Sequence, residues 1–356
     1  MRFKGFKTVS FTSVGNRGLN PTISLSRTRR VENPVWNFTL PYTFQGTVAG
    51  YMSGGDKIPS TPPILTYNII DKFPFATNAN ATDVGDLTAL KSSIAGQSSG
   101  TSGYVSGGDN VIEKFPFASN GNATDVGDLS VARFSATGQS SNVSGYASGG
   151  YSATPPVAVR YRTTIDKFPF ATNSNATNIG ALSQARRYAA GQSSTVSGYT
   201  SGGQAFTPAP PDLYVNTIDK FPFATDAGAT DVGDMTRLTY TNTGQSSDVS
   251  GYTSGGYGRL PPGTPRPASP AAIRNIIDKF PFATNANATD VGDLTVSRQS
   301  VAGQSSTASG YTSGGYITGG GGASNVIDKF PFATDANATD VGDLSRLGSG
   351  ETGLQD

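Results

Sequence analysis

The chain has 356 residues, with 26 Lys and Arg against 25 Asp and Glu, so its formal net charge is +1. It contains no cysteine and no histidine, which excludes disulfides and a cysteine nucleophile and removes the commonest general base and metal ligand. No apolar run approaches the roughly 20 residues that span a bilayer, and the N-terminus lacks the apolar core of a secretory signal, so we expect a soluble, non-enzymatic protein.

The N-terminal segment differs in charge from the rest of the chain. Residues 1–30 hold seven basic residues and no acidic residue, leaving 19 basic against 25 acidic residues elsewhere. Hydrophobic residues are interleaved with these charges, which favours a segment that becomes ordered on a protein partner over a nucleic-acid-binding tail. We expect residues 1–35 to be a docking arm; a tail folded back on the acidic body is the alternative. Its basic residues are Arg2, Lys4, Lys7, Arg17, Arg27, Arg29 and Arg30.

An alternating, β-prone run at residues 35–44 predicts a first strand. After it, a Gly-Tyr-x-Ser-Gly-Gly element occurs six times. Each copy predicts a short strand that ends at a diglycine, where residues without Cβ tolerate a turn or a close approach of neighbouring backbone. The tyrosines of the six copies are Tyr51, Tyr104, Tyr146, Tyr199, Tyr252 and Tyr311.

A second recurring string, Ile-Asp-Lys-Phe-Pro-Phe, also occurs six times. Its copies begin at Ile70, Ile112, Ile165, Ile218, Ile277 and Ile327, the second with Glu for Asp. Paired phenylalanines such as Phe73 and Phe75 are two residues apart and therefore point to one side of a strand. Pro74 lacks the N–H that a central ladder needs, so the strand must end or bulge there. We interpret the Asp71–Lys72 pair and its copies as a ladder of charges along an edge.

The element Asn-Ala-Thr-Asp-Val-Gly-Asp-Leu follows each string and predicts a turn and a short outer strand. Its closely spaced oxygen ligands, as in Asp335 to Asp343, raise the alternative of a calcium site, although Asn and Asp are ordinary turn formers. We expect no cofactor. The Asn-Ala-Thr sequons are attributed to duplication of the repeat, not to glycosylation. Five Gly-Gln-Ser-Ser elements, at Gln97, Gln139, Gln192, Gln245 and Gln304, separate the six units.

About four short strands per unit predict an all-β fold, a six-bladed β-propeller with antiparallel blades. An open β-solenoid is the alternative, but its coils are usually shorter, roughly 20–30 residues. We expect the propeller at residues 36–346, with residues 36–46 supplying the opening strand of the first blade and residues 347–356 forming a C-terminal tail. The expected repeats cover about 36–88, 89–130, 131–183, 184–236, 237–295 and 296–345.

The order of these elements resembles the kelch motif: a diglycine after an aromatic-containing strand, the Lys-Phe strand, a strand ending in Leu, and a basic residue at Arg133, Arg186 or Arg298. Val84 and Val126 stand where kelch blades place Trp, so the packing between blades is expected to differ. The whole phrase, over residues 46–346, resembles repeats of structural and tail-associated proteins of marine bacteriophages. The resemblance implies a virion protein; scaffolds of this kind serve many functions.

The segment between each diglycine and the next Ile-Asp-Lys string varies freely in length and content, whereas the rest of the unit barely varies. In a propeller these loops emerge on one face, and a rigid scaffold with divergent loops is a common form of binding surface. Aromatic and Arg side chains are the usual anchors of such contacts. The candidate binding residues are Lys57, Tyr67, Tyr151, Arg160, Tyr161, Arg162, Phe206, Asp212, Tyr214, Tyr257, Arg259, Arg266 and Tyr316.

We therefore predict a non-enzymatic structural and adhesion protein on the tail or capsid surface of a phage, present in several copies. The arm would contact other virion proteins, and the variable loops would contact a host receptor, a glycan or a neighbouring subunit; neither nucleic-acid binding nor membrane insertion is expected. Two alternatives stay open, a lectin-like propeller outside a virion and a propeller hydrolase that uses paired carboxylates.

Overall fold

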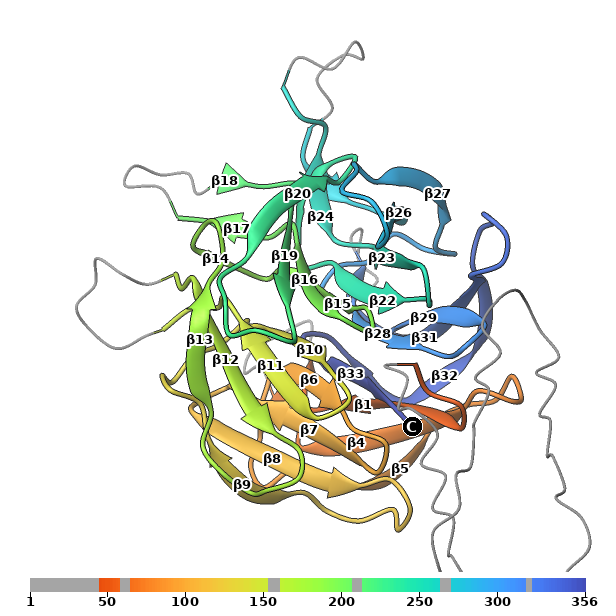
Figure 1. Cartoon of the computed structure of the whole chain (residues 1–356). Coiled ribbons are helices and arrows are strands. Elements are labelled where there is room, and N and C mark those ends of the chain that lie inside the picture. Colours follow the sequence, from red (N-terminus) through yellow and green to blue (C-terminus); the bar gives the residue numbers. More distant parts are fainter. Residues whose placement is uncertain (1–44, 58–64, 153–160, 207–212, 263–269, 318–321) are drawn as a thin grey trace, which may run out of the picture. The chain divides into compact units, whose positions relative to one another are not determined.

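The computed structural model describes residues 45–57, 65–152, 161–206, 213–262, 270–317 and 322–356 (Figure 1). These residues form strands, turns and bends, and none of them lies in a helix. Accordingly, this part of the chain offers no helix long and apolar enough to cross a membrane. The predicted strand at residues 35–44 and the arm lie outside the described residues.

Six antiparallel sheets share one strand order, and we number them along the chain. Sheet 1 contains β33 (Thr352–Gln355), β1 (Ala49–Ser53), β4 (Ile69–Pro74) and β5 (Thr82–Asp86). Sheet 2 contains β6 (Ala95–Ser98), β7 (Ser102–Ser106), β8 (Val111–Pro116) and β9 (Thr124–Asp128). Sheet 3 contains β10 (Thr137–Ser140), β11 (Ser144–Ser148), β12 (Thr164–Pro169) and β13 (Thr177–Ala181).

The other three sheets repeat this order. Sheet 4 contains β15 (Ala190–Ser193), β16 (Ser197–Ser201), β19 (Thr217–Pro222) and β20 (Thr230–Asp234). Sheet 5 contains β22 (Thr243–Ser246), β23 (Ser250–Ser254), β26 (Ile276–Pro281) and β27 (Thr289–Asp293). Sheet 6 contains β28 (Ala302–Ser305), β29 (Ser309–Ser313), β31 (Gly322–Pro331) and β32 (Thr339–Gly348), with β30 (Tyr316–Ile317) beside β31.

Smaller sheets form from the segments that vary between repeats. They are the pair β2 (Asp56–Lys57) and β3 (Leu65–Thr66), the set β14 (Arg186–Arg187), β17 (Gln204–Ala205) and β18 (Leu213–Tyr214), and the set β21 (Leu238–Tyr240), β24 (Tyr257–Arg259) and β25 (Ala272–Ile273). The two larger of these sheets pair a variable segment with residues just before an innermost strand, β14 or β21.

The third strand of each sheet shows why the repeat folds as it does. It ends at its proline in all six copies, as predicted, because Pro cannot donate to the ladder. The first phenylalanine, for example Phe73, is buried over the glycine opposite it in the second strand, and a Cβ on Gly50 would overlap the ring of Phe73. The glycine of the Gly-Tyr pair is thus required by the aromatic ring that covers it.

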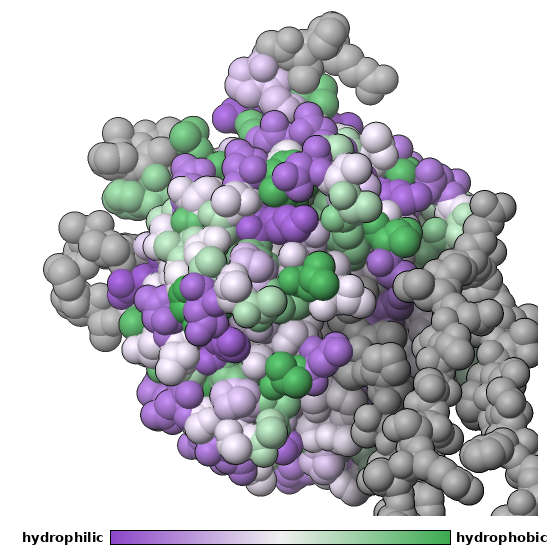
Figure 2. Space-filling view, viewed as in Figure 1, coloured by the Kyte–Doolittle hydropathy of each residue, from purple (hydrophilic) through white to green (hydrophobic). Residues whose placement is uncertain are grey.

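Aromatic side chains join each sheet to the next. The tyrosine of the second strand stacks on the second phenylalanine of the following sheet, with ring centroids 4.7–4.9 Å apart. Tyr311 of sheet 6 stacks on Phe75 of sheet 1, so the series returns to its start. Each such pair contributes about 1 kcal/mol beyond the area it buries. Large apolar side chains are buried between the sheets. On the face seen in Figure 2, hydrophobic and hydrophilic residues are interspersed.

Backbone hydrogen bonds link the outer edges of the same sheets. One alanine N–H of each sheet donates to a backbone carbonyl of the preceding sheet over 2.7–2.8 Å. Ala123 of sheet 2, for example, donates to Asp86 of sheet 1, and Ala81 of sheet 1 donates to Asp343 of sheet 6. The innermost strands also contact one another in sequence, from β6 through β10, β15, β22 and β28 to β33, which returns to β6 (Figure 1). The arrangement is β-propeller-like.

Two expectations are wrong. The opening strand of sheet 1 is β33, which pairs with β1 through Tyr51 opposite Leu354, so residues 347–356 are not a tail and residues 36–46 do not hold that place. Leu354 stands where the five other units have Gln, and this substitution hides the sixth copy of the element. The Asp71–Lys72 pair is not an edge ladder either, because Asp71 is fully buried and accepts hydrogen bonds from Ser345 of sheet 6.

Candidate binding site

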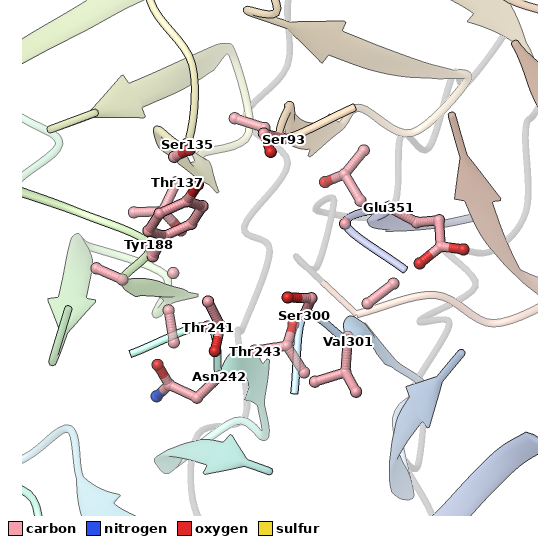
Figure 3. Close-up of a pocket in the computed structure, with 18 of the residues that line it drawn as sticks. Ser93, Ser135, Thr137, Tyr188, Thr241, Asn242, Thr243, Ser300, Val301 and Glu351 are labelled. Carbon is pink, nitrogen blue, oxygen red and sulfur yellow. The ribbon is translucent and has the colours of Figure 1, made fainter. Parts of the chain in front are cut away.

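Six residues, one before each innermost strand, form a closed circle of backbone hydrogen bonds, which we call the mouth ring. Each N–H donates to the carbonyl of the preceding unit over 2.6–3.0 Å, and Ser93 donates to Gly350 to complete the circle. The members are Ser93, Ser135, Tyr188, Thr241, Ser300 and Gly350. Figure 3 shows its first five members around one central opening.

The mouth ring holds its backbone in an unfavourable conformation. Its five non-glycine members have φ of 54–57°, in the left-handed region that side chains with a Cβ rarely occupy, and Thr241 is in addition β-branched. A residue in this region costs of order 1–3 kcal/mol and persists only where its surroundings determine it. Here the circle of hydrogen bonds holds the backbone in this conformation, and it thereby fixes five side chains around the opening.

A cavity of about 510 Å³ begins at the mouth ring and extends along the innermost strands to six glycines, which we call the glycine ring. The glycine ring comprises Gly96, Gly138, Gly191, Gly244, Gly303 and Gly353, and it also borders a smaller cavity beyond it. Residues that carry hydroxyl groups, among them Ser135, Thr137 and Thr243, line this cavity together with alanines and other apolar residues (Figure 3). Such a cavity suits a polar ligand that donates and accepts several hydrogen bonds.

Five of the six variable segments have their first described residues beside the mouth ring. Asp56 bridges to Ser349, Tyr151 to Phe134, and Tyr316 to Gln299, each partner being the residue just before a ring member. Gln204 and Tyr257 pair in the same way with Arg187 and Tyr240. The first residues of these five segments therefore lie at the same end of the innermost strands. Arg160, Asp212 and Arg266 lie outside the described residues.

The structure brings together three of the predicted binding residues, which follow the second strands of sheets 3 and 4 along the chain. Tyr161 lies between Tyr151 and Phe206, in edge-to-face contacts with ring centroids 6.1 and 5.9 Å apart. The guanidinium carbon of Arg187 lies 4.8–5.2 Å from the ring centroids of Tyr151, Tyr161 and Tyr188. Cation–π contacts of this length are attractive and hold the guanidinium in place.

A second group of rings continues the first. Tyr188 is 6.2 Å from Tyr240, and Tyr240 contacts both Tyr214 and Tyr257 at 4.7 and 5.7 Å. Burial and the neighbouring tyrosines raise the pKa of Tyr240 to about 12, so its hydroxyl stays protonated at neutral pH. We call the whole set the aromatic band; it comprises Tyr151, Tyr161, Phe206, Tyr188, Tyr240, Tyr214 and Tyr257. Arg259 lies over Tyr214 at its end, 6.0 Å from the centroid.

The remaining predicted residues do not join the aromatic band through any contact between described residues. Lys57 is exposed on β2, and Tyr67 packs instead under Arg346, whose guanidinium carbon is 4.3 Å from the ring centroid. Arg162 is half-buried, with its N–H donating to Gly150. The sequence-based list missed Arg187, Tyr188 and Tyr240. The first two break the repeat, since Phe134 and Ser135 hold the same positions in the preceding unit, and this departure was the available clue.

Glu351 is a second departure from the repeat that the sequence-based interpretation missed. Its position holds Ile94, Ala136, Ala189, Asn242 and Val301 in the other units. Neither carboxylate oxygen has a hydrogen-bond partner, and the nearest cation is Arg346, with Nη1 3.5 Å from Oε1. Burial raises the pKa of Glu351 to about 8, Asp56 and Asp71 act in the same direction, and Arg346 opposes them.

The stability of the protein is expected to fall with rising pH because of Glu351. The folded chain holds this proton more tightly than the unfolded chain, in which the ordinary pKa is 4.5, so stability is highest below that value and declines until about pH 8. The decline should amount to about 5 kcal/mol. In Glu351→Gln this decline in the free energy of unfolding should be absent, as measured by urea unfolding at several pH values. Asp340→Asn, at an exposed acid, is the control, and an unchanged profile in Glu351→Gln would contradict the expectation.

Side-chain oxygen atoms that could have bound calcium in the Asn-Ala-Thr-Asp-Val-Gly-Asp turns accept hydrogen bonds from the backbone instead. Asn122 Oδ1 accepts a hydrogen bond from the N–H of Asp86 in the preceding sheet, and Asn80, Asn175, Asn287 and Asn337 make the same link. Asp83 Oδ1 accepts from the N–H of Gly85 within its own turn. Among the residues with described positions, no group of three acidic side chains gathers as a metal site would require. The recurring Asn is explained by the contact between sheets.

Comparison with known proteins adds no family assignment to this geometry: no family model matches the chain, and no curated protein matches it.

Proposed function

We propose that residues 45–356 form a closed, six-bladed, kelch-like β-propeller in which sheets 1 to 6 are the blades. Three independent series of contacts support this proposal, because each returns to its starting unit: the stacked Tyr–Phe pairs, the alanine hydrogen bonds at the outer edges, and the mouth ring. An open solenoid would leave its first and last units without such mutual contacts. Closure between the first and last sheets is made by β33, which completes sheet 1 from the end of the chain.

We further propose that the protein is a non-enzymatic adhesion component of a phage particle, with the propeller displayed and residues 1–35 as the attachment. The observation that carries the display role is the gathering of the variable segments beside the mouth ring, where they form the aromatic band on a scaffold whose repeated parts barely change. Rigid scaffolds with divergent loops are a common form of binding surface. Assignment to a virion depends on the resemblance of the repeats to those of marine phage proteins.

A lectin outside a virion is the second candidate. The observation in its favour is the position of the aromatic band beside a cavity lined by hydroxyl groups, since sugars offer both apolar faces and hydroxyls to such a site. A hydrolase has less support. Asp56 and Glu351 border the cavity, but the side chain of Glu351 is fully buried and lacks the contact with solvent that a substrate would need.

Removal of residues 1–35 is expected to abolish incorporation into particles while leaving the propeller folded, because the described sheets make their closing contacts without the arm. The measurement is co-sedimentation of tagged protein with assembled particles, alongside circular dichroism of the purified variant. A full-length variant with the seven basic residues of the arm changed to Ser separates the contribution of charge from that of length. Equal incorporation of the truncated and full-length chains would overturn the attachment role of the arm.

A further inference from the structure

We propose that the aromatic band and Arg187 bind an acidic oligosaccharide, one whose sugar rings bear carboxylates. This inference names the ligand class for the display surface and therefore rests on the proposed adhesive role. It starts from Arg187, because this residue stands at the junction between the band and the central cavity, which both Arg187 and Tyr188 line.

The side chain of Arg187 is held in place by neighbouring residues without forming an ion pair within the described part of the protein, so its charge is available to a ligand. Its Nε donates to Gln204 Oε1 over 3.0 Å, and three tyrosine rings surround the guanidinium. In the described part of the chain it has no carboxylate partner, and its two terminal nitrogens make no hydrogen bond. By contrast, Arg186, the residue before it, is fully buried and paired with Asp219 over 2.9 Å. A guanidinium fixed by rings with two free terminal nitrogens is the arrangement that binds a carboxylate through two parallel hydrogen bonds.

The charged residues of the described segments that carry the aromatic band are all basic, whereas Asp56 and Glu351 line the neighbouring cavity. Four more arginines belong to the segments that carry the band or flank it, namely Arg162, Arg237, Arg259 and Arg274. Within the described residues of these segments, at 149–152, 161–164, 185–190, 202–206, 213–216, 237–243, 255–262 and 270–275, no acidic residue occurs. The acidic body of the protein thus presents a locally basic surface here, which favours an anionic ligand and speeds its encounter.

The rings indicate a sugar more than an acidic peptide. Tyr151, Tyr188, Tyr214 and Tyr257 are partly exposed. Tyr188 and Tyr240 also line the cavity, whose lining includes Thr241 and Ser300. Pyranose rings offer a C–H face to an aromatic ring and hydroxyls to Ser and Thr, while the carboxylate of a uronic acid offers a partner to Arg187. An extended peptide would instead require an open sheet edge or an apolar groove.

The test uses the full chain and oligomers of six galacturonate or mannuronate units, titrated by calorimetry. Arg187→Gln and Tyr188→Ser are suitable variants because Gln299 and Ser135 stand at the same positions in other units, so the fold should accept them. Each is expected to weaken binding at least tenfold. Lys114→Gln removes the same charge from sheet 2, away from the band, and should leave binding unchanged. A neutral maltohexaose should not bind.

Three results would overturn the ligand class: equal binding of the acidic and neutral oligomers, equal affinity of Arg187→Gln and Lys114→Gln, or binding of a hexa-aspartate peptide in place of the uronates. These outcomes are distinct from a failure of the adhesive role. If purified protein attaches to host cells but binds no uronate oligomer, the ligand class is wrong and the display role stands. If it binds uronates but particles lacking it attach to cells normally, the adhesive role is wrong.

Discussion

Replacement of Gly244 by alanine is expected to cost about 3 kcal/mol or more in the free energy of unfolding. A Cβ at this position would overlap the carbonyl oxygen of Gly191 in the neighbouring innermost strand, and it would also approach the side-chain nitrogen of Gln192. The obstacle is backbone held by two sheets, so it cannot rotate away as a flexible side chain would. Gly138 and Gly353 have the same relation to Gly96 and Gly303, and their substitutions should behave alike.

The matched control is Gly121→Ala. A Cβ there has no neighbour closer than 3.7 Å, and the residue is not in the left-handed region. Alanine at such a site is expected to be neutral or to stabilise by roughly 0.5 kcal/mol through the unfolded chain. Urea unfolding followed by circular dichroism measures both variants. If Gly244→Ala proved as stable as Gly121→Ala, the innermost strands would be farther apart than the structure places them.

Local features of the fold were predictable from the sequence because each depends on residues close together in the repeat. The proline that ends the third strand, the diglycine turn and the outer strand of Thr82–Asp86 follow from backbone chemistry that any copy shows. Six copies of the same string gave the same local structure six times.

Features that join distant units were not predictable in the same way. Arg133 follows the outer strand of sheet 2 and Asp166 lies in the third strand of sheet 3, and only the packing of the sheets shows that the two side chains meet. The closing strand was missed for a related reason. Its Thr-Gly-Leu-Gln sequence keeps the glycine of the element and loses the glutamine, so Leu354 could be recognised only by its pairing with Tyr51.

The candidate site was only partly predictable because its defining residues are departures from the repeat. Tyr151, Tyr161 and Phe206 were selected as aromatic residues in variable segments, and they do meet. Arg187, which lies among three rings, belongs to a segment that was interpreted as part of the blade and was therefore overlooked. The position of Arg187 holds Ser92, Phe134, Tyr240, Gln299 and Ser349 in the other units, so it varies between repeats as a loop position does.

Replacement of Arg186 by methionine is expected to destabilise the protein by about 3–5 kcal/mol near neutral pH, because it leaves a buried carboxylate without its cation. Arg186 Nη2 lies 2.9 Å from Asp219 Oδ2 and both side chains are fully buried, while the same nitrogen donates to the carbonyl of Thr200. Asp219 would retain only its hydrogen bonds from the N–H and hydroxyl of Ser183. Chemical denaturation of the variant and of the unchanged protein gives the difference directly.

Sheet 5 provides an internal comparison for this prediction. Thr239 stands there in place of the arginine, and burial raises the pKa of Asp278, the counterpart of Asp219. Asp219 in Arg186→Met would likewise be a buried carboxylate without a cation, so the stability of the variant should recover as the pH falls. Adding Asp219→Asn should restore most of the loss at neutral pH. The control is Lys279→Met at the exposed pair with Asp335, which should cost less than about 1 kcal/mol. Equal costs for Arg186→Met and Lys279→Met would mean that the buried pair contributes no more than a surface contact.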